Sequence, residues 1–346
     1  MRVVVTGASG NVGTSLLRAL AADADVEEIV GLARRLPPRD LHEAEWQAAD
    51  IEHDDLVAHF RGADCVVHLA WAIQPSHDLA ALRRTNVDGS ERVFRAVGEA
   101  GVPSLVYASS VGAYSPGPKD RRVDESWPTE GTPTSFYARH KAEVEALLDR
   151  FQLERPETRV VRLRPGLIFK RSSGEEQRRY FLGPLFPRVL ARRGALAVVP
   201  DIDGLRFQAV HTRDVAEAYR LAVVGDARGP FNVAAEPILD ARTLAQALGA
   251  RVLPLPPSVA RGAVTASWRL RLQPTPPGWL DMGLAVPLMD TARARRELGW
   301  EPERSSTDAI LDLLAGIRGG AGGKTPPLRP GRVPDGVGSL PPGRGG

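Results

Sequence analysis

A serine, a tyrosine and a lysine in this sequence have the types and spacing of an acid–base site. Ser110 ends the apolar run SLVYASS, and Tyr137 and Lys141 follow in the run SFYARHKAEVEALL. The second run is expected to be helical, so a spacing of four places the phenol and the amine on one face. A nearby ammonium favours the phenolate form of a tyrosine. We therefore expect Lys141 to lower the pKa of Tyr137, and Ser110 to hydrogen-bond a substrate oxygen while the phenol moves a proton.

The element that must position this set is the N-terminal stretch, which has the pattern of a strand, a glycine turn and a helix. Arg2–Thr6 is a β-branched run typical of buried parallel strands, and Asn11–Ala22 carries a helical apolar stripe. The spacing GxxGxxG between them permits a sharp turn, close approach of a pyrophosphate and close packing of the helix. A helix N-terminus also attracts an anion. The stretch predicts a dinucleotide site lined by Gly7, Ser9, Gly10, Asn11, Val12 and Gly13.

The end of the second predicted strand, Glu28–Ala33, indicates which dinucleotide binds. An acidic side chain at this place bonds the ribose 2′-hydroxyl of NAD, whereas an arginine accommodates the 2′-phosphate of NADP. Arg34 and Arg35 stand there and no carboxylate does. The sequence therefore favours NADP over NAD as cofactor, the alternative being that both arginines are solvated loop residues. Asp50 and Ile51, after a third short strand, are expected at the adenine edge.

Alternation of strands and helices through residue 110 predicts the fold class. Residues 65–72 have the pattern of a buried strand, a helix is expected over about 79–100, and SLVYASS follows as the fifth strand. This order predicts an α/β fold with a Rossmann-type doubly wound parallel sheet. His68 inside the 65–72 strand is expected to be a core residue. Trp71, at its carboxyl end, is expected either to pack or to wall the cleft where ligands sit in open sheets.

Further motifs occur along residues 1–316 in a fixed order: TGASGNVG, VVHLAWA, TNVDGS, YASSVGAY, Tyr137-x-x-x-Lys141, RLRPGLIF, VHTRDVAEA, FNVA and LGWEP. Together they resemble the extended short-chain dehydrogenase/reductase superfamily, and within it the NAD-dependent epimerase/dehydratase family. The resemblance implies Ser110, Tyr137 and Lys141 as catalytic residues, with Lys141 also bonding the nicotinamide ribose and Asn86 positioning the lysine through water. It implies hydride transfer at a carbinol or carbonyl carbon. Predicted cofactor contacts beyond the glycine turn are Leu69, Ala70, Trp71, Tyr137, Lys141, Pro165 and Leu167.

Three places differ from better-known members and bear on the substrate. Val111 and Gly112 stand where sugar dehydratases of the family have an Asp-Glu pair, so dehydration is disfavoured. Leu167 stands where nucleotide-sugar epimerases often carry an asparagine, and Phe207 where they often carry an arginine. Both departures argue against a diphosphate-bearing substrate. A loop arginine could restore the charge, and the candidates are Arg171, Arg178 and Arg179.

Three functions therefore stay open. The first is an NAD(P)-dependent oxidoreductase or epimerase, and an epimerase would keep its nicotinamide through the cycle. The second is a simple NADPH-dependent ketone reductase or alcohol dehydrogenase acting on a non-nucleotide substrate. The third is a non-catalytic dinucleotide-binding sensor or scaffold, which predicts damage to the serine, tyrosine and lysine set, although all three residues are intact.

The second half of the chain predicts a smaller domain and a tail. Residues 1–166 and 207–236 are expected to form the dinucleotide-binding domain. Residues 167–206 and 237–318 are expected to form a mainly helical C-terminal substrate-binding domain. In residues 319–346, Gly and Pro make up 16 of 28 residues, a composition that buries little apolar surface and predicts disorder.

Composition and charge narrow the partners. The chain has 346 residues and a formal charge of +3, all of it accounted for by residues 319–346, so the nearly neutral body predicts no nucleic-acid partner. Cys65 is the single cysteine, which excludes a disulfide framework and fits a reducing compartment. No apolar run approaches the roughly 20 residues that cross a membrane. We expect a cytoplasmic protein with a small-molecule substrate, no metal and no membrane partner. A homodimer is implied only by the family resemblance.

Overall fold

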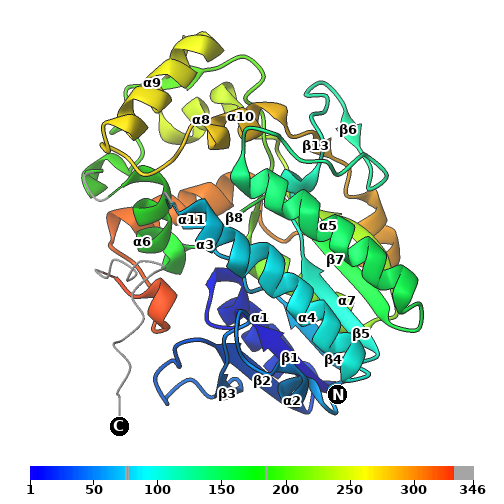
Figure 1. Cartoon of the computed structure of the whole chain (residues 1–346). Coiled ribbons are helices and arrows are strands. Elements are labelled where there is room, and N and C mark those ends of the chain that lie inside the picture. The colour runs from blue at the N-terminus through cyan, green and yellow to red at the C-terminus, as the bar shows by residue number, and fades with distance from the viewer. Residues whose placement is uncertain (75, 77, 184–185, 331–346) are drawn as a thin grey trace.

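A seven-stranded parallel sheet lies at the centre of the molecule (Figure 1). The computed structural model describes residues 1–74, 76, 78–183 and 186–330. The strand order is β11-β7-β5-β4-β1-β2-β3, with all neighbours parallel. The strands are β1 Arg2–Thr6, β2 Glu28–Ala33, β3 Glu45–Ala48, β4 Cys65–His68, β5 Ser104–Ala108, β7 Arg159–Pro165 and β11 Gly229–Val233. The predicted doubly wound α/β fold is confirmed.

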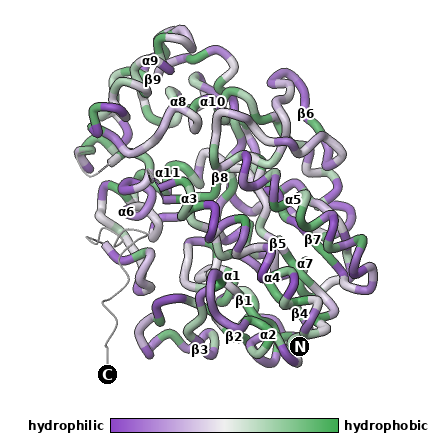
Figure 2. The backbone as a smooth tube through the Cα atoms, in the orientation of Figure 1, coloured by the Kyte–Doolittle hydropathy of each residue, from purple (hydrophilic) through white to green (hydrophobic). Residues whose placement is uncertain are grey.

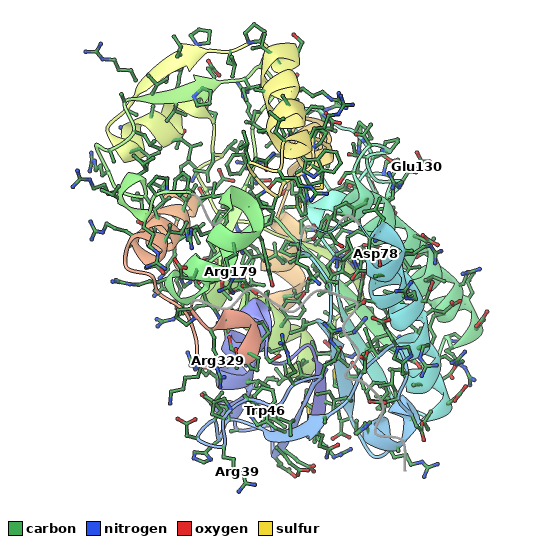
Figure 3. All side chains as sticks on the ribbon, turned by 60° about the vertical axis from the view of Figure 1, so that its left-hand side comes forward. Arg39, Trp46, Asp78, Glu130, Arg179 and Arg329 are labelled. Atoms are coloured by element: carbon green, nitrogen blue, oxygen red, sulfur yellow. The ribbon has the colours of Figure 1, made fainter. Side chains whose placement is uncertain are left out.

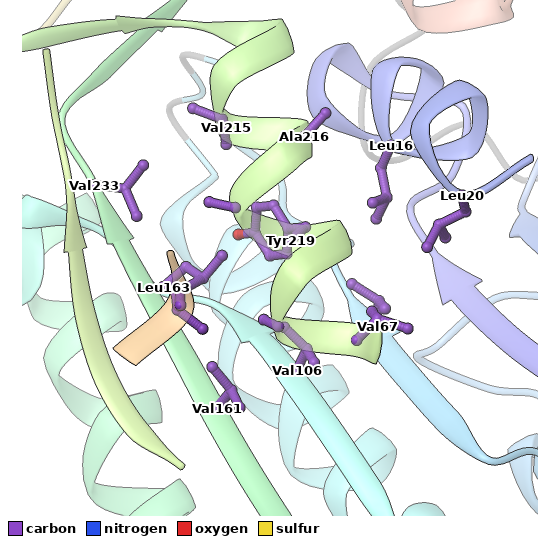
Figure 4. Packing of buried hydrophobic residues seen from close by; sticks show 14 of the residues in the cluster. Leu16, Leu20, Val67, Val106, Val161, Leu163, Val215, Ala216, Tyr219 and Val233 are labelled. Atoms are coloured by element: carbon purple, nitrogen blue, oxygen red, sulfur yellow. The ribbon is translucent and has the colours of Figure 1, made fainter. Parts of the chain in front are cut away.

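Helices cover both faces of the sheet, and most residues of its central strands are hydrophobic (Figure 2). In β1, Val3 and Val5 pack with one cluster and Val4 with the other, because successive side chains of a strand point to opposite faces. Figure 4 shows one cluster, where α7 packs Val215 and Tyr219 against the sheet. The helices on that face are α1 Asn11–Ala21 and α7 Thr212–Val224; those opposite are α2 Leu56–Phe60, α4 Gly89–Glu99 and α5 Phe136–Glu154.

The helix predicted over residues 79–100 is interrupted. It consists of α3 Leu79–Arg83, a π-helical turn η1 Arg84–Asp88, and α4. A π turn accommodates an extra residue, and such turns occur often at functional sites. The apolar periodicity alone does not reveal this turn. The turn holds Asn86 fully buried, with 0% exposure.

The remaining segments combine helices with short strand pairs. Three two-stranded parallel pairs join β8 to β10, β9 to β12 and β6 to β13. The predicted mainly helical character of the C-terminal segments is confirmed, with short strands added, and the domain boundaries stay a prediction. The strands are β6 Arg122–Val123, β8 Leu167–Phe169, β9 Val198–Asp201, β10 Ala209–His211, β12 Arg251–Pro254 and β13 Leu288–Met289. The helices are α6 Gly174–Gln177, α8 Ala241–Leu248, α9 Pro257–Arg269, α10 Gly278–Ala285 and α11 Ser306–Arg318.

The first part of the predicted disordered tail is ordered. Residues 319–330, which we call the C-terminal strap, bury Leu328 to 2% exposure and form a short 3₁₀ turn, η7 Pro326–Leu328. Arg179, on the π-helical turn η4 Arg178–Leu182, donates to the carbonyl oxygens of Arg329 at 2.9 Å and Pro327 at 3.1 Å (Figure 3). The composition of the tail predicted disorder because Gly and Pro bury little apolar surface. The strap is held instead by Arg179, which lies outside the tail and which composition does not reveal. Residues 331–346 lie outside the described residues.

Two structural features are absent from the part of the chain that the structure describes. No helix there is both long and apolar enough to cross a bilayer. No cluster of three or more His, Cys, Asp or Glu side chains there is arranged to hold a metal ion. Cys65 is a buried free thiol.

Candidate active site

The carboxyl edge of the sheet collects most of the predicted site residues. The glycine turn follows β1, Leu69 and Ala70 follow β4, Ser110 follows β5, and Pro165 ends β7. In a doubly wound sheet this edge is where ligands bind. Gly7 has φ +69°, and a Cβ there would lie 2.6 Å from the Ala70 backbone nitrogen. The turn and the Leu69–Ala70 segment therefore lie in contact, as a shared binding edge requires.

The glycine turn suits a phosphate-bearing ligand. Helix α1 begins at Asn11 with Gly10 as its N-cap and no side-chain cap bond, so its first N–H groups keep their capacity to bind an anion. A Cβ on Gly13 would lie 2.5 Å from the Ala8 carbonyl oxygen, whereas one on Gly10 would meet only the Gly7 oxygen, at 3.3 Å. Gly13 thus permits helix packing, and Gly10 leaves the outer side of the turn open. Ser9 and Val12 lie in the same turn, with Ser9 8% exposed.

Lys170 adds a cation to this turn that the motifs did not predict. It follows β8, and its Nζ donates to the Asn11 carbonyl oxygen at 2.5 Å, to Thr14 Oγ1 at 2.8 Å and to Ser15 Oγ at 3.2 Å. Burial lowers the pKa of Lys170 to about 8. The lysine joins the first turn of α1 to a segment more than 150 residues away, a contact that local spacing cannot indicate.

The predicted adenosine contacts divide into two groups. Arg34 and Arg35 are exposed on the loop that leaves β2. Burial and the charge of Glu176 raise the pKa of Tyr180, and the charges of Arg179, Arg35 and Arg34 partly oppose that rise. This loop is therefore a positively charged region at the edge of the sheet.

Asp50 and Ile51 have structural contacts of their own. The Asp50 carboxylate accepts a hydrogen bond from the Glu52 backbone N–H at 3.0 Å, which closes a turn. Ile51 is 6% exposed and packs beneath α4, where a Cβ on Gly89 would lie 2.9 Å from its Cδ1. Leu167, by contrast, is 38% exposed at the start of β8. Leu167 therefore lies outside the buried part of the carboxyl edge of the sheet.

The structure places Ser110 and Tyr137 next to each other. Tyr137 lies in the first turn of α5, within hydrogen-bonding reach of the Ser110 side chain. Ser110 Oγ also accepts the Gly112 backbone N–H at 3.0 Å. Burial raises the pKa of Tyr137 to about 12, and the bond to Ser110 opposes part of that rise. The expected lowering of the pKa of Tyr137 is therefore wrong for this arrangement.

The physical reason lies in the position of Lys141. Its Nζ donates to the Ala108 carbonyl oxygen at 2.6 Å and lies 3.4 Å from the centroid of the Trp71 ring. The centroid of the Tyr137 ring is 5.9 Å away. Burial lowers the pKa of Lys141 well below its usual value, and the charge of Glu145 opposes this. The amine therefore gives the phenolate little support.

Glu145 explains why Ser110 and not Ser109 faces the site. Ser109 Oγ donates to Glu145 Oε1 at 2.5 Å. Glu145 is 0% exposed and pairs with Arg162 at 2.7 Å and Arg164 at 2.8 Å. Ser109 is thus held in a buried ionic cluster under the lysine. Sequence reasoning missed this cluster, although Glu145 continues the spacing of four from Tyr137 and Lys141 and both arginines stand in RLRP.

Asn86 and His68 support the loop that carries Trp71. Asn86 Oδ1 accepts the Ala72 backbone N–H at 2.7 Å, and Nδ2 donates to the Ala72 carbonyl oxygen at 3.0 Å. Its predicted action on Lys141 through water stays a prediction. The His68 ring nitrogens contact Thr6 Oγ1 at 2.7 Å and Ser90 Oγ at 3.0 Å, and burial lowers its pKa to about 3. His68 is the core residue that the sequence predicted.

Arg178 and Arg179, two of the three candidate diphosphate-binding arginines, are engaged elsewhere, whereas Arg171 hydrogen-bonds a neighbour among the described residues only through its backbone. Arg178 pairs with Glu175, Arg179 binds the strap, and Arg206 Nη1 donates to the Lys119 carbonyl oxygen at 3.3 Å. The backbone N–H of Arg171 donates to Asp312 at 2.9 Å, at the edge of α11. These contacts do not replace the diphosphate-binding groups that the sequence lacks.

Known proteins resemble this chain over most of its length. A protein of Mycobacterium tuberculosis (strain ATCC 25618 / H37Rv), described as uncharacterized, is 29% identical over 325 residues, covering 93% of this chain and 31% of that protein. This chain thus spans about a third of that relative. The 4-hydroxy-2-methyl-3-oxo-4-farnesyl-3,4-dihydroquinoline-1-oxide ketoreductase of Stigmatella aurantiaca is 29% identical over 234 residues, 66% of each chain.

The structural comparison agrees with the fold. The UDP-glucose 4-epimerase of Thermus thermophilus, solved with NAD, superposes with a TM-score of 0.66 over 92% of this chain and 99% of that one, at 22% identity. Identity this low shows the fold alone. The family model described as "NAD dependent epimerase/dehydratase family" matches residues 3–234. Because that match covers more than half of the chain, the resemblance drawn from the motifs is confirmed, and the chain belongs to this family.

Proposed function

We propose that this protein is an NAD(P)-dependent oxidoreductase that interconverts a carbonyl and a carbinol on a small, non-nucleotide substrate. The observation that carries the proposal is that Tyr137 lies beside Ser110 at the carboxyl edge of the sheet, where a Cβ on Gly112, two residues after Ser110, would lie 3.0 Å from Tyr137 Cε1. This pair lies at the edge that also holds the glycine turn and the free N-terminus of α1. A dinucleotide anchored by that turn would extend toward the pair.

Each residue has a role in this reaction. Ser110 donates a hydrogen bond to the substrate oxygen and orients it beside the phenol. Tyr137, protonated because burial raises its pKa, donates its proton as the carbonyl oxygen becomes a hydroxyl. The nicotinamide, when bound, supplies the hydride to the carbonyl carbon. Lys141 would hold the nicotinamide ribose, and the glycine turn with the N-terminus of α1 would hold the pyrophosphate.

Two observations favour a ketone reductase over a nucleotide-sugar epimerase. Arg178 and Arg179 bind other protein groups, and Leu167 and Phe207 offer no charge to a diphosphate. The relative from Stigmatella aurantiaca is named a ketoreductase, which supports carbonyl reduction here. Val111 and Gly112 lie beside Tyr137 without an acid or base of their own, which fits the absence of dehydration chemistry.

The test combines cofactor binding with turnover in Tyr137→Phe. Loss of the hydroxyl should abolish NADPH oxidation with a panel of simple ketones and leave cofactor affinity almost unchanged. Tyr107→Phe is the matched control, because the buried Tyr107 hydroxyl has no partner among the described residues, and it should retain activity. Full turnover by Tyr137→Phe would overturn the mechanism. Cofactor binding without turnover of any carbonyl or carbinol would favour the sensor or scaffold.

Cofactor retention separates an epimerase from a reductase. A reductase must exchange its nicotinamide in every cycle, whereas an epimerase keeps it. Mass spectrometry of the purified, dialysed protein should therefore find little bound dinucleotide. A stoichiometric, non-dialysable cofactor would instead favour the epimerase. We further propose NADP as the preferred dinucleotide, supported by Arg34 and Arg35 beyond β2.

A further inference from the structure

Aromatic side chains from three separate segments surround the catalytic phenol. The Tyr137 ring lies 4.9 Å from the Trp279 ring, centroid to centroid, at an interplanar angle of 34°. It lies 5.9 Å from the Trp71 ring at 75°. Phe181 meets the edge of Trp279, with centroids 5.1 Å apart and an angle of 86°. We call Trp71, Phe181 and Trp279 the aromatic cage.

Two polar groups of the aromatic cage have no hydrogen-bond partner among the described residues. They are the indole N–H groups of Trp71 and Trp279, and both are buried. Buried indole N–H groups usually find an acceptor, because an unpaired one loses its bond to water without compensation. Two unpaired indole N–H donors beside the Tyr137 hydroxyl indicate that acceptor atoms of a bound ligand receive their hydrogen bonds.

The cage residues are held in place from outside. Trp279 follows Gly278, where a Cβ would lie 2.3 Å from the Thr134 carbonyl oxygen, so the start of α10 packs directly on the segment before α5. Asp281, two residues on, pairs with Arg261 of α9 at 2.8 Å. The Phe181 carbonyl oxygen accepts the Thr275 hydroxyl at 2.8 Å. The three aromatic rings are therefore fixed features rather than freely rotating surface groups.

The charged groups around the aromatic cage also indicate the charge of the ligand that it can bind. The nearest cation is Lys141, which the Ala108 carbonyl oxygen and the Trp71 face already engage. Arg178 and Arg179, from the turn that carries Phe181, pair with Glu175 and with the strap. A neutral, flat ligand fits such surroundings better than an anionic one.

We propose that the substrate carries a planar aromatic ring next to its reacting carbonyl, and that Trp279 selects it by stacking. This inference rests on the proposed function and adds the substrate class. The ring lies against Trp279, which places the attached carbonyl oxygen at Ser110 and Tyr137. A second acceptor atom on the ring system receives an indole N–H.

The experiment compares two ketones of similar size, acetophenone and cyclohexyl methyl ketone, as kcat/KM with saturating NADPH. Stacking should make wild-type protein prefer acetophenone about tenfold. Trp279→Leu should remove that preference mainly through the KM of acetophenone. Trp127→Leu is the matched control, because this half-buried tryptophan already donates its N–H to the Ser115 carbonyl oxygen at 3.3 Å. It should keep the preference.

Trp279→Phe separates stacking from hydrogen bonding. This variant should keep the preference for acetophenone. Its kcat/KM for 2-acetylpyridine, whose ring nitrogen accepts a hydrogen bond, should fall about tenfold. Equal kcat/KM for the aromatic and cyclohexyl ketones in wild-type protein would overturn this inference and leave the proposed function standing. Absence of turnover with either ketone and with a broad alcohol panel, despite NADPH binding, would instead count against the proposed function.

Discussion

The Nζ atom of Lys141 lies 3.4 Å from the ring centroid of Trp71, over the face of the indole. A cation in this position is attracted by the ring quadrupole, and the Ala108 carbonyl oxygen adds a hydrogen bond at 2.6 Å. The Tyr137 hydroxyl instead lies within reach of the Ser110 side chain. The phenol therefore stays a proton donor at neutral pH, which suits reduction of a carbonyl better than oxidation of an alcohol.

The two directions of the reaction should differ in their pH dependence. Burial raises the pKa of Tyr137 to about 12, so the protonated phenol that reduction needs persists from about pH 6 to about pH 9. We expect a flat kcat for reduction over this range. Alcohol oxidation needs the phenolate and should rise about tenfold per pH unit. Steady-state profiles in both directions test this, and an oxidation rate that levels off near pH 7 would contradict it.

Glu145 should be essential for stability. Glu145→Gln leaves Arg164 buried without its carboxylate and Arg162 with only the carboxylate of Asp149, which should cost about 3–5 kcal/mol of unfolding free energy. Glu143→Gln, on the same helix but 43% exposed beside Arg83, should cost less than about 1 kcal/mol. Urea unfolding at pH 7 measures both changes.

The cost of Glu145→Gln should also depend on pH. Burial alone would raise the pKa of Glu145, but Arg164 and Arg162 lower it to about 2, below its usual value of 4.5. The stabilisation is therefore complete above about pH 4.5 and is lost as the pH falls toward 2. The difference between wild type and variant should shrink over that window. A difference that stays constant would mean that the ionised carboxylate is not its source.

Local patterns in the sequence predicted the parts of the fold that depend on neighbouring residues. The strand, turn and helix around Gly7 and the core position of His68 follow from spacing and apolar runs. The start of α11 is likewise local, because Ser305 caps it through a capping box with Asp308. These features need only contacts within one or two elements, or a fold class whose topology is fixed.

The missed features depend on contacts between distant segments. Trp279 approaches Tyr137 from α10, Lys170 reaches α1 from β8, and Arg179 anchors the strap. Their residue types are ordinary and their neighbours in sequence carry no motif. The predicted effect of Lys141 on Tyr137 was wrong because helical spacing fixes which face a side chain leaves, but not which of several groups on that face it contacts.

Cofactor preference should depend on Arg34. A charge-assisted hydrogen bond contributes about 1.5–3 kcal/mol, so Arg34→Ala should weaken NADP binding by about 10- to 100-fold and leave NAD binding nearly unchanged. Fluorescence titration of both dinucleotides measures this. Arg39→Ala, on the same exposed loop, serves as the control for a general loss of positive charge. Tighter binding of NAD than of NADP by wild-type protein would remove the argument from Arg34.

Alanine substitutions at the glycines of the turn should have separate effects on fold stability and on dinucleotide binding. Gly13→Ala places a Cβ 2.5 Å from the Ala8 carbonyl oxygen, which should destabilise the fold by about 1–3 kcal/mol. Gly10→Ala has more room, at 3.3 Å from the Gly7 oxygen, so it should fold but lose most of its dinucleotide affinity. Gly262→Ala, in α9 with nothing within 4 Å, should stabilise the helix by up to about 1 kcal/mol. Calorimetry with and without NADPH distinguishes the three.

The C-terminal strap should stabilise the molecule although its composition favours disorder. A chain ending at Gly319 loses the carbonyl partners of Arg179, the Ala321 carbonyl that accepts the Glu175 N–H at 3.1 Å, and the buried Leu328 side chain. Three hydrogen bonds of about 1 kcal/mol each and one buried leucine of about 2 kcal/mol together give about 5 kcal/mol before the cost of ordering the segment. Thermal unfolding should therefore begin several degrees lower. A chain ending at Pro330 keeps every one of these contacts and is the control. If the two truncated chains unfold at the same temperature, the strap contributes nothing to stability and its contacts are incidental.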